Sequence, residues 1–311
     1  MNNSWKVTAA ESGARLDKFL ASAQRLGSRG RAADALARGK IYWNDREATP
    51  EDAGAALAAG DSVRLWMDRP GSAKRRQTTL GPQRDLPVIY DDSDLVVLDK
   101  PAGVLAVPLP RRGEARSVFD DLKDFLARRH KPRPLVVHRI DRDTSGLVVF
   151  AKHLRAQQHL RDQFRRHTAT RLYLAVVYGH PSPPAGTWRD RLVWDQRALI
   201  QKETHPQDPA GKDAVSHYQV VERYRSTSLI EVTLVTGRRN QIRLQARLRG
   251  HTLVGETRYV YGPETLRTIA FPRQALHAWR LAFRHPAGGR ELQFEAAVPA
   301  DMEALLRRLR D

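Results

Sequence analysis

The chain has 311 residues, and its 53 lysines and arginines against 35 acidic residues give a formal net charge of +18. This excess predicts a polyanionic partner, for which nucleic acid and an anionic membrane surface are the candidates. No apolar stretch approaches the roughly 18 to 20 residues that span a bilayer, and the amino terminus carries no apolar signal segment. The absence of cysteine excludes disulfides, thiolate metal sites and cysteine nucleophiles. We therefore expect a cytoplasmic protein that acts on RNA or DNA and does not bind a membrane.

Residues 1–66 are predicted to form a small domain in which two helices precede short strands. Apolar residues at helical spacing between positions 15 and 20 indicate the first helix. A second helical pattern runs from Arg29 to Arg38 and stops at Gly39, a residue typical of helix ends. Strands are expected at residues 40–44 and 62–66.

Three short stretches of this domain resemble the S4-type RNA-binding domain. They are Arg-Leu-Asp-Lys-Phe-Leu from residue 15, Gly-Lys-Ile-Tyr-Trp-Asn from residue 39 and Ala-Gly-Asp-Ser-Val from residue 59. The resemblance implies that the basic residues on and after the second helix face RNA phosphates, namely Arg29, Arg31, Arg38 and Lys40. A small folded appendage with an ordinary exposed helix is the alternative.

Residues 67–85 have the composition of a linker. They contain two prolines, two glycines and the basic run Lys74-Arg75-Arg76, with little apolar periodicity. Such a segment would let the front domain make its own contacts while it stays tethered.

Residues 86–311 alternate strands and helices in a pattern that favours an α+β domain over a doubly wound one. Strands are expected at residues 88–90, 95–98, 135–137, 147–150, 172–177, 214–222, 229–235 and 292–297. Helices are expected from a cap at Ser117 to about Arg129, and at residues 156–166, 240–248 and 301–309.

One turn in this region stands out, because it carries an acid between two arginines and lies between two apolar strands. It reads His-Arg-Ile-Asp-Arg-Asp-Thr-Ser-Gly from His138 to Gly146, with Asp141 flanked by Arg139 and Arg142. Arginines beside a carboxylate keep it ionised and oriented. A structural ion pair that closes the turn is the simpler interpretation.

The same string closely resembles the signature His-Arg-Leu-Asp-x-x-Thr-Ser-Gly of the RluA family of pseudouridine synthases, with Ile140 in place of leucine. The resemblance implies that Asp141 is the catalytic residue and that Arg142 fills the gap left by a flipped nucleotide. It gives His138 and Arg139 structural or RNA-positioning roles. It also implies the fold of that family, a long mixed and mostly antiparallel sheet with flanking helices and a central cleft.

The second family motif resembles Arg171-Leu172-Tyr173. By this resemblance Tyr173 stacks on the target base near the aspartate, a use that suits a ring with a polar hydroxyl. Without the other motifs, a half-buried strand tyrosine would be the preferred interpretation.

The third family motif, Thr-Gly-Arg-x-His-Gln-Ile-Arg, resembles residues 236–243. The resemblance implies that Arg243 pairs with the catalytic aspartate and that Ile242 packs near the base edge. Asn240 stands where the family motif has histidine. Glu256 stands where the family commonly has aspartate, in the pattern Gly-Asp-x-x-Tyr that matches residues 255–259. Both departures are expected to lie outside the pair of Asp141 and Arg243.

The segment from Val232 to Gly255 has arginines but no acid, which predicts contact with an anionic partner. A merely exposed basic face is the alternative. Its arginines are Arg238, Arg239, Arg243, Arg247 and Arg249, of which the first two are assigned to RNA. Lys100, in a Lys-Pro-x-Gly element, is expected to support the cleft structurally.

Together these observations predict an RNA pseudouridine synthase that needs neither cofactor nor metal, because isomerising uridine requires no redox step and no group donor. Large-subunit ribosomal RNA is the substrate that the resemblance favours, transfer RNA is the nearest alternative, and a monomer is expected. Two rivals from other classes are a non-catalytic RNA-binding or assembly factor and a glycosidase acting on a polyanion. The glycosidase would need a second carboxylate, and no motif places one beside Asp141.

Overall fold

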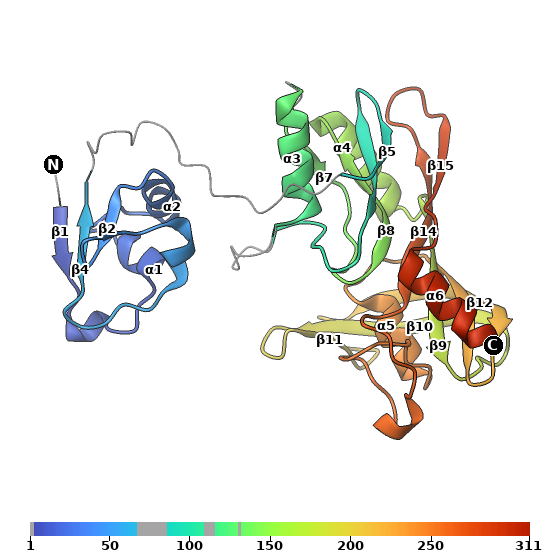
Figure 1. Cartoon of the computed structure of the whole chain (residues 1–311). Coiled ribbons are helices and arrows are strands. Elements are labelled where there is room, and N and C mark those ends of the chain that lie inside the picture. Colours follow the sequence, from blue (N-terminus) through green and yellow to red (C-terminus); the bar gives the residue numbers. More distant parts are fainter. Residues whose placement is uncertain (1–2, 67–85, 109–115, 130–131) are drawn as a thin grey trace. The chain divides into compact units, whose positions relative to one another are not determined.

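The computed structural model describes residues 3–66, 86–108, 116–129 and 132–311, and these fall into two compact units, Met1–Arg84 and Asp85–Asp311 (Figure 1). The linker expected at residues 67–85 lies outside the described residues. In the part of the chain that the structure describes, no helix is both long and apolar enough to cross a bilayer.

The first unit is a four-stranded antiparallel sheet covered by two short helices. Its strands are β1 (Asn3–Lys6), β2 (Ile41–Trp43), β3 (Arg46–Glu47) and β4 (Ser62–Leu65), in the order β1-β4-β2-β3. Its helices are α1 (Leu16–Leu20) and α2 (Arg29–Ala37), with 3-10 turns η1 (Ala9–Glu11) and η2 (Pro50–Gly54). The core joins Leu16, Leu20 and Leu36 of the helices to Ile41 and Val63 of the strands. Both expected helices and both expected strands are confirmed, whereas β1 and β3 were not predicted.

The second unit is built on one sheet of eleven strands, which is antiparallel except where β14 lies beside β8. The main order is β11-β10-β12-β13-β9-β14-β8-β6-β5, with β7 added to β8 and β15 to β14. The strands are β5 (Val88–Asp91), β6 (Leu95–Lys100), β7 (Leu135–Val136), β8 (Ser145–Ala151), β9 (Thr170–Tyr178), β10 (Ala185–Asp195), β11 (Ile200–Glu203), β12 (Lys212–Arg223), β13 (Thr227–Leu234), β14 (Leu276–Arg284) and β15 (Glu291–Glu295). The helices are α3 (Val118–Arg128), α4 (Leu154–Arg165), α5 (Gln241–Leu248) and α6 (Ala300–Arg310), with a 3-10 turn η3 (Glu264–Leu266). The α+β class is therefore confirmed.

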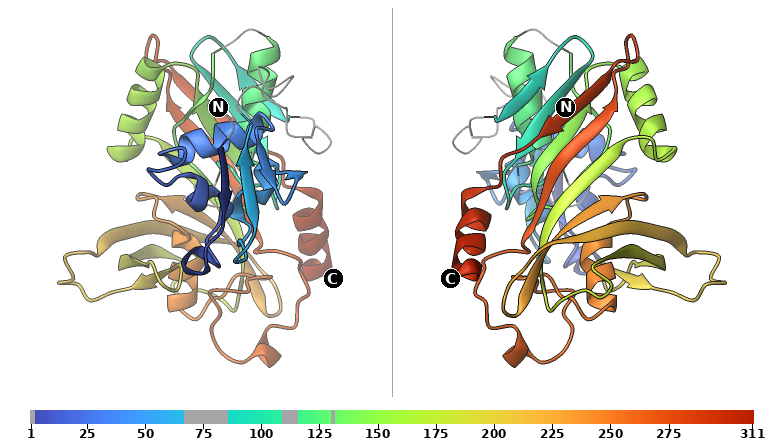
Figure 2. Two further views of the ribbon diagram at one scale, coloured as in Figure 1. Left: turned by 90° about the vertical axis from the view of Figure 1, so that its left-hand side faces the viewer. Right: turned by 90° about the vertical axis from the view of Figure 1, so that its right-hand side faces the viewer.

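Helices cover both faces of the β5–β6–β8 half of the sheet, as Figure 2 shows. Alternate residues of a strand point to opposite faces, and the two cores separate accordingly. Leu122 of α3 belongs to the same core as Leu98 on one face of β6, whereas Leu160 of α4 belongs to the same core as Val97 on the other face. This two-sided burial explains the continuous apolar runs that the sequence shows in β6 and β8.

The other half of the sheet is covered in the same way by α5 and α6. Ile242 of α5 belongs to the core that contains Tyr173 of β9, whereas Met302 of α6 belongs to the core that contains Leu174. The amino-terminal end of α5 is thereby fixed over the face of the sheet that carries Tyr173.

Strand β14 is the central element that the sequence analysis missed, together with β10 and β11. It pairs with β9 on one side and with β8 on the other, so that Ala278 lies opposite both Tyr173 and Gly146. Gly146 has a φ of +110°, and a Cβ on it would lie 2.2 Å from the Ala278 carbonyl oxygen. The glycine that ends the motif is therefore required by the close approach of β14.

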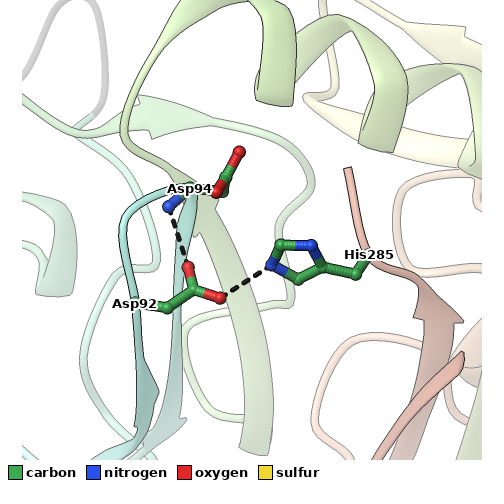
Figure 3. A group of neighbouring side chains, drawn as sticks. All are labelled: Asp92, Asp94 and His285. Atoms are coloured by element: carbon green, nitrogen blue, oxygen red, sulfur yellow. Dashed lines mark hydrogen bonds and ion pairs between the residues drawn. The ribbon is translucent and has the colours of Figure 1, made fainter. Parts of the chain in front are cut away.

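A cluster of three side chains ties the turn after β5 to the end of β14 (Figure 3). Asp92 Oδ2 accepts from His285 Nε2 at 2.7 Å, and Oδ1 accepts from the backbone amide of Asp94 at 2.8 Å. Asp94, in turn, bonds to His153 Nε2 at 3.1 Å. The ligand atoms of Asp92, Asp94 and His285 lie close enough to surround a cation, but each is already hydrogen-bonded within the protein. We therefore interpret the cluster as a structural clamp.

The clamp makes stability depend on pH in a defined direction. Burial opposes the charged form of His285, but the Ala287 carbonyl and the Asp92 carboxylate outweigh it and raise the pKa of His285 above its ordinary value. A raised pKa stabilises the fold at pH values below the ordinary pKa and loses this effect as the pH rises through the folded-state pKa. His285→Gln is expected to lower the free energy of unfolding by about 1 kcal/mol more at about pH 5.5 than at about pH 8.5.

Urea unfolding of the full chain at the two pH values measures this difference. His217→Gln is the matched control, because His217 is exposed on β12 and bonds only to the Thr187 hydroxyl within the described residues. An equal loss at both pH values for His285→Gln would contradict the charged clamp.

Candidate active site

A cavity of about 460 Å³ opens in the second unit where three segments meet. The segments are the loop between β7 and β8, strand β9 with the residues before it, and the turn that leads into α5. The residues that line it include His138, Arg139, Ile140, Asp141, Thr144, Phe164, Arg165, His167, Arg171, Tyr173, Gly237, Arg238, Asn240, Ile242 and Arg243. The cavity thus brings together parts of all three motifs that the sequence analysis singled out.

Asp141 is held through one of its two carboxylate oxygens. Oδ2 accepts a hydrogen bond from Asn240 Nδ2 at 2.6 Å and lies 3.4 Å from Arg243 Nη1. Within the described residues no hydrogen bond reaches Oδ1, and 21% of the side chain is exposed. The carboxylate is therefore oriented by the protein through Oδ2, while Oδ1 is not engaged by the described residues and Asp141 lines the cavity.

Arg243 is fixed mainly by another acid. Its Nε and Nη2 donate to Glu256 Oε2 and Oε1 at 2.6 and 2.7 Å, which leaves Nη1 for Asp141. The Glu256 side chain is fully buried, and its Oε1 also accepts from backbone amides, among them that of Arg258 at 2.8 Å. Burial alone would raise the pKa of the Glu256 carboxyl, but the bonds and charge of Arg243 outweigh it and lower that pKa. Glu256 therefore stays ionised and positions Arg243.

Asn240 connects this network to a buried tyrosine. It adopts the left-handed conformation, with a φ of +53°, directly before α5, which asparagine tolerates better than most residues. Its Oδ1 accepts from the Tyr259 hydroxyl at 3.3 Å while its Nδ2 donates to Asp141. Asn240 and Glu256 were expected to lie outside the pair of Asp141 and Arg243. The structure instead places each of them in direct contact with one member of it.

Tyr173 and Ile242 form the apolar wall of the cavity beside Asp141. Both are buried, Tyr173 in the middle of β9 and Ile242 in the first turn of α5. Burial raises the pKa of the Tyr173 hydroxyl to about 12. The ring therefore stays protonated near neutral pH, and it offers its surface rather than a charge.

The arginines next to Asp141 in sequence do not hold it, which corrects the expectation from the sequence. Arg142 is exposed and its Nε donates to Asp143 Oδ1 at 3.2 Å. Arg139 is exposed at the cavity and, among the described residues, forms no ion pair with Asp141. The orienting groups come from Asn240 and Arg243 instead.

His138 has a structural place. Its Nε2 accepts from the backbone amide of Val149 at 3.1 Å, and its ring stacks on Phe164 with centroids 4.6 Å apart. Burial lowers the pKa of His138 to about 3, so the imidazole is neutral at physiological pH. The ring therefore ties the start of the loop to β8 without adding charge.

Lys100 holds the other end of the same loop. It is fully buried, and its Nζ donates to the carbonyls of Pro101, Val104 and Arg142 at 2.7, 2.9 and 2.8 Å. Burial lowers the pKa of Lys100 to about 7. The structural role expected for Lys100 thus takes the form of a direct contact with the residue after Asp141.

The arginine-rich segment is less free than its sequence suggests. Arg249 forms an ion pair with Asp190 at 2.6 Å, and Arg243 is paired as described above. Arg238 Nε donates to the Asp213 carbonyl at 2.9 Å, and Arg239 lies over the ring of Trp194 at 4.0 Å. Two of the five arginines are thus matched by acids outside the segment, which its sequence alone does not reveal.

The residues assigned to RNA in the first unit differ in exposure. Arg29 and Arg31 are exposed on α2, whereas Arg38 and Lys40 are half-buried, and Arg38 Nε pairs with Asp34 at 2.7 Å. Their expected role in RNA binding stays a prediction.

The chain matches the RNA pseudouridylate synthase family over residues 94–248, a range that contains Asp141, Tyr173 and Arg243. It is 36% identical to the uncharacterized RNA pseudouridine synthase YlyB of Bacillus subtilis, with 99% of both chains covered. It is also 35% identical to ribosomal large subunit pseudouridine synthase D of Zymomonas mobilis, over 98% of this chain and 97% of that one. The chain belongs to the RNA pseudouridylate synthase family.

Two solved structures support the fold. The human RNA pseudouridylate synthase domain containing 4 protein aligns with a TM-score of 0.59 and 22% identity, over 72% of this chain and 93% of that one. The domain containing 1 protein aligns with a TM-score of 0.56 and 20% identity, over 75% and 98%. The fold expected from the motifs is thus confirmed, and the family together with the relatives shows that the protein is an RNA pseudouridine synthase.

The contact between Asn240 and Asp141 predicts the effect of an isosteric charge change. Asn240→Asp would place a second carboxylate next to Asp141 Oδ2, and such repulsion raises the pKa of one of the two acids. The synthase is expected to lose turnover by about 100-fold at low pH and to recover part of it as the pH rises. Release of tritium from RNA labelled at uridine C5, measured across a pH series, follows this change.

Asn240→His is the matched control, because a ring N–H can replace the amide donor. It is expected to retain most of the activity. A pH profile for Asn240→Asp that matches that of the unmodified chain would show that the 2.6 Å contact does not orient the acid.

Proposed function

We propose that this synthase uses Asp141 as its catalytic carboxylate to isomerise uridines of large-subunit ribosomal RNA. The observation that carries the proposal is that Asp141, with Oδ1 not engaged by the described residues, lines a cavity together with Tyr173 and Ile242. Asn240 and Arg243 hold the other oxygen, so the acid is oriented before the substrate arrives.

The reaction rearranges bonds within one nucleotide. The bond from N1 to C1′ breaks, a bond from C5 to C1′ forms, C5 loses its proton and N1 gains one. An oriented carboxylate beside the sugar can serve either as a nucleophile at C1′ or as a base toward the 2′ carbon. In both routes Tyr173 supplies the stacking surface that keeps the freed base in place while it turns.

The target nucleotide must leave its helix to reach this acid. Asp141 lines a cavity of about 460 Å³, the size of a site for one small ligand, and extruding one base costs a few kcal/mol of stacking and pairing. Arg142 is exposed next to Asp141, and its planar cation suits the vacated base position. The exposed Arg29 and Arg31 of the first unit, by resemblance an S4-type domain, would add sequence-tolerant phosphate contacts.

The choice of ribosomal RNA is supported by the relatives. Besides the Zymomonas protein, ribosomal large subunit pseudouridine synthase D of Nitrosomonas europaea is 32% identical over 96% of this chain and 85% of that one. The high similarity along the whole chain includes the first unit, which a catalytic domain alone would not require. Transfer RNA is the second candidate, because the volume of the cavity does not distinguish between the two kinds of RNA.

Asp141→Asn tests the catalytic assignment. The variant keeps the shape of the carboxylate but cannot act as nucleophile or base, so we expect no detectable pseudouridine and RNA affinity within a few-fold of the unmodified chain. Tritium release and filter binding measure the two quantities. Asp124→Asn on α3, which removes an equal charge from an ion pair with Arg116, should retain full activity. Retained activity in Asp141→Asn would refute the assignment.

Mapping of pseudouridines in cells that lack the protein tests the substrate. We expect specific sites of large-subunit ribosomal RNA to lose the modification, and we expect the unmodified gene, but not Asp141→Asn, to restore them. Loss confined to transfer RNA would favour the second candidate.

A further inference from the structure

Arg171 is a buried cation in the active-site cavity without an acid to balance it. It lies on β9 two residues before Tyr173, with 8% of its surface exposed, and it lines the same cavity as Asp141. Nη2 donates to the carbonyls of Val235 and Leu234 at 3.1 and 3.4 Å. Nε is buried and unpaired, and in the described part of the chain neither a hydrogen bond to Nη1 nor an ion pair is formed.

Among the described residues one further arginine is buried to the same extent, and it shows what a purely structural guanidinium looks like in this protein. Arg273 is equally buried, but it forms a two-pronged ion pair with Asp301 at 2.7 and 2.9 Å and also binds three backbone carbonyls. Burying a charge without a partner is costly. The carbonyl contacts of Arg171 explain its position but leave its charge and its Nε unsatisfied.

The neighbouring turn leaves room at this guanidinium. A Cβ on Gly237 would lie 2.3 Å from Arg171 Nη1, so any side chain at this position would displace the cation. The guanidinium also lies over the ring of Phe164 at 5.4 Å. The cation therefore packs against an aromatic ring and a bare glycine, and Nη1, beside the glycine that also lines the cavity, is the donor left for a ligand.

The charges around the cavity favour an anion at this end. Asp141 is the sole acid among the described lining residues, whereas Arg139, Arg165, Arg171, Arg238 and Arg243 all contribute positive charge. The group that RNA offers to a guanidinium is phosphate, which accepts several hydrogen bonds at once. The volume of the cavity also lies within the roughly 300 to 1,000 Å³ of typical ligand sites.

We propose that Arg171 forms a phosphate subsite that binds a backbone phosphate flanking the flipped uridine. This inference rests on the proposed function, because it needs a nucleotide whose sugar faces Asp141. Arg171 and Asp141 then hold the two ends of one nucleotide, with Tyr173 between them on the same strand as Arg171. The phosphate accepts from Nη1, balances the charge of the guanidinium and sets the position of C1′ relative to the acid.

The test removes the charge of single phosphates, by methylphosphonate substitution, and separately removes the charge of Arg171. A stem-loop that carries the mapped uridine is synthesised with single methylphosphonates at each phosphate from two positions before to two positions after the target. Binding is measured in the Asp141→Asn background, and single-turnover rates are measured with the active enzyme. One methylphosphonate is expected to weaken binding by about 10- to 100-fold. Arg171→Gln is expected to bind unmodified RNA more weakly by a similar factor. The affinity of this variant should not change further when that same methylphosphonate is present.

Two further variants separate a local contact from a general effect of charge. Arg161→Gln removes an exposed arginine of α4 that does not line the cavity, and it should keep the full sensitivity to the methylphosphonate. Arg171→Lys keeps the charge and should keep part of the sensitivity, so it carries the test if Arg171→Gln does not fold.

The outcomes are distinct. Equal losses from every methylphosphonate in the unmodified chain and in the Arg171 variants would overturn the subsite and leave Arg171 a structural cation. Failure of the proposed function would show differently, as an active Asp141→Asn or as an unmodified chain that forms no pseudouridine in any RNA.

Discussion

The orientation of the Asp141 carboxylate depends on the contact between its Oδ2 and the amide of Asn240, two residues that are 99 positions apart in the chain. A loop cannot hold a carboxylate in this way by itself, because its backbone must first be fixed. Lys100 binds the Arg142 carbonyl after the acid, and Gly146 is pressed against Ala278 of β14. The sheet order β9-β14-β8 then brings Tyr173 and the loop to the same edge of the cavity. The position of Asp141 Oδ2 therefore depends on how the strands of the sheet are arranged.

Glu256 determines how many oxygens of the Asp141 carboxylate Arg243 can engage. An arginine with no other partner would form a two-pronged pair with Asp141 and engage both of its oxygens. Because Glu256 binds two nitrogens of Arg243, only Nη1 is left for Asp141, and that contact is long, at 3.4 Å. The ion pair with Glu256 therefore keeps Oδ1 of Asp141 free. The same ion pair keeps the buried Glu256 ionised, because the bonds and charge of Arg243 lower its pKa.

The sequence allowed the elements and the motif residues to be predicted, but not the contacts between motifs. Short-range patterns were sufficient for α3, α4 and β8, because caps and apolar periodicity are local. Strand β14 was missed since its burial depends on two partners that are distant in the chain. The same limit applies to Asn240 and Glu256, which were identified only as departures from a family pattern. Their contacts with Asp141 and Arg243 follow from tertiary structure, and no spacing rule could have revealed them.

Two buried side chains of the site, His138 and Tyr173, do not change charge near neutral pH. Burial keeps His138 neutral, with a pKa of about 3, and keeps Tyr173 protonated, with a pKa of about 12. An imidazole at position 240, where the family commonly has histidine, would be a further titratable group in contact with Asp141, whereas an amide donates the same kind of bond at every pH. His138 is buried, and the group that contacts Asp141 is the amide of Asn240. The hydrogen bond that orients Asp141 therefore does not depend on the protonation of its donor. Lys100, with a pKa of about 7, is then the group behind the loop whose charge responds to pH, and it acts on the backbone after Asp141 and not on the carboxylate itself.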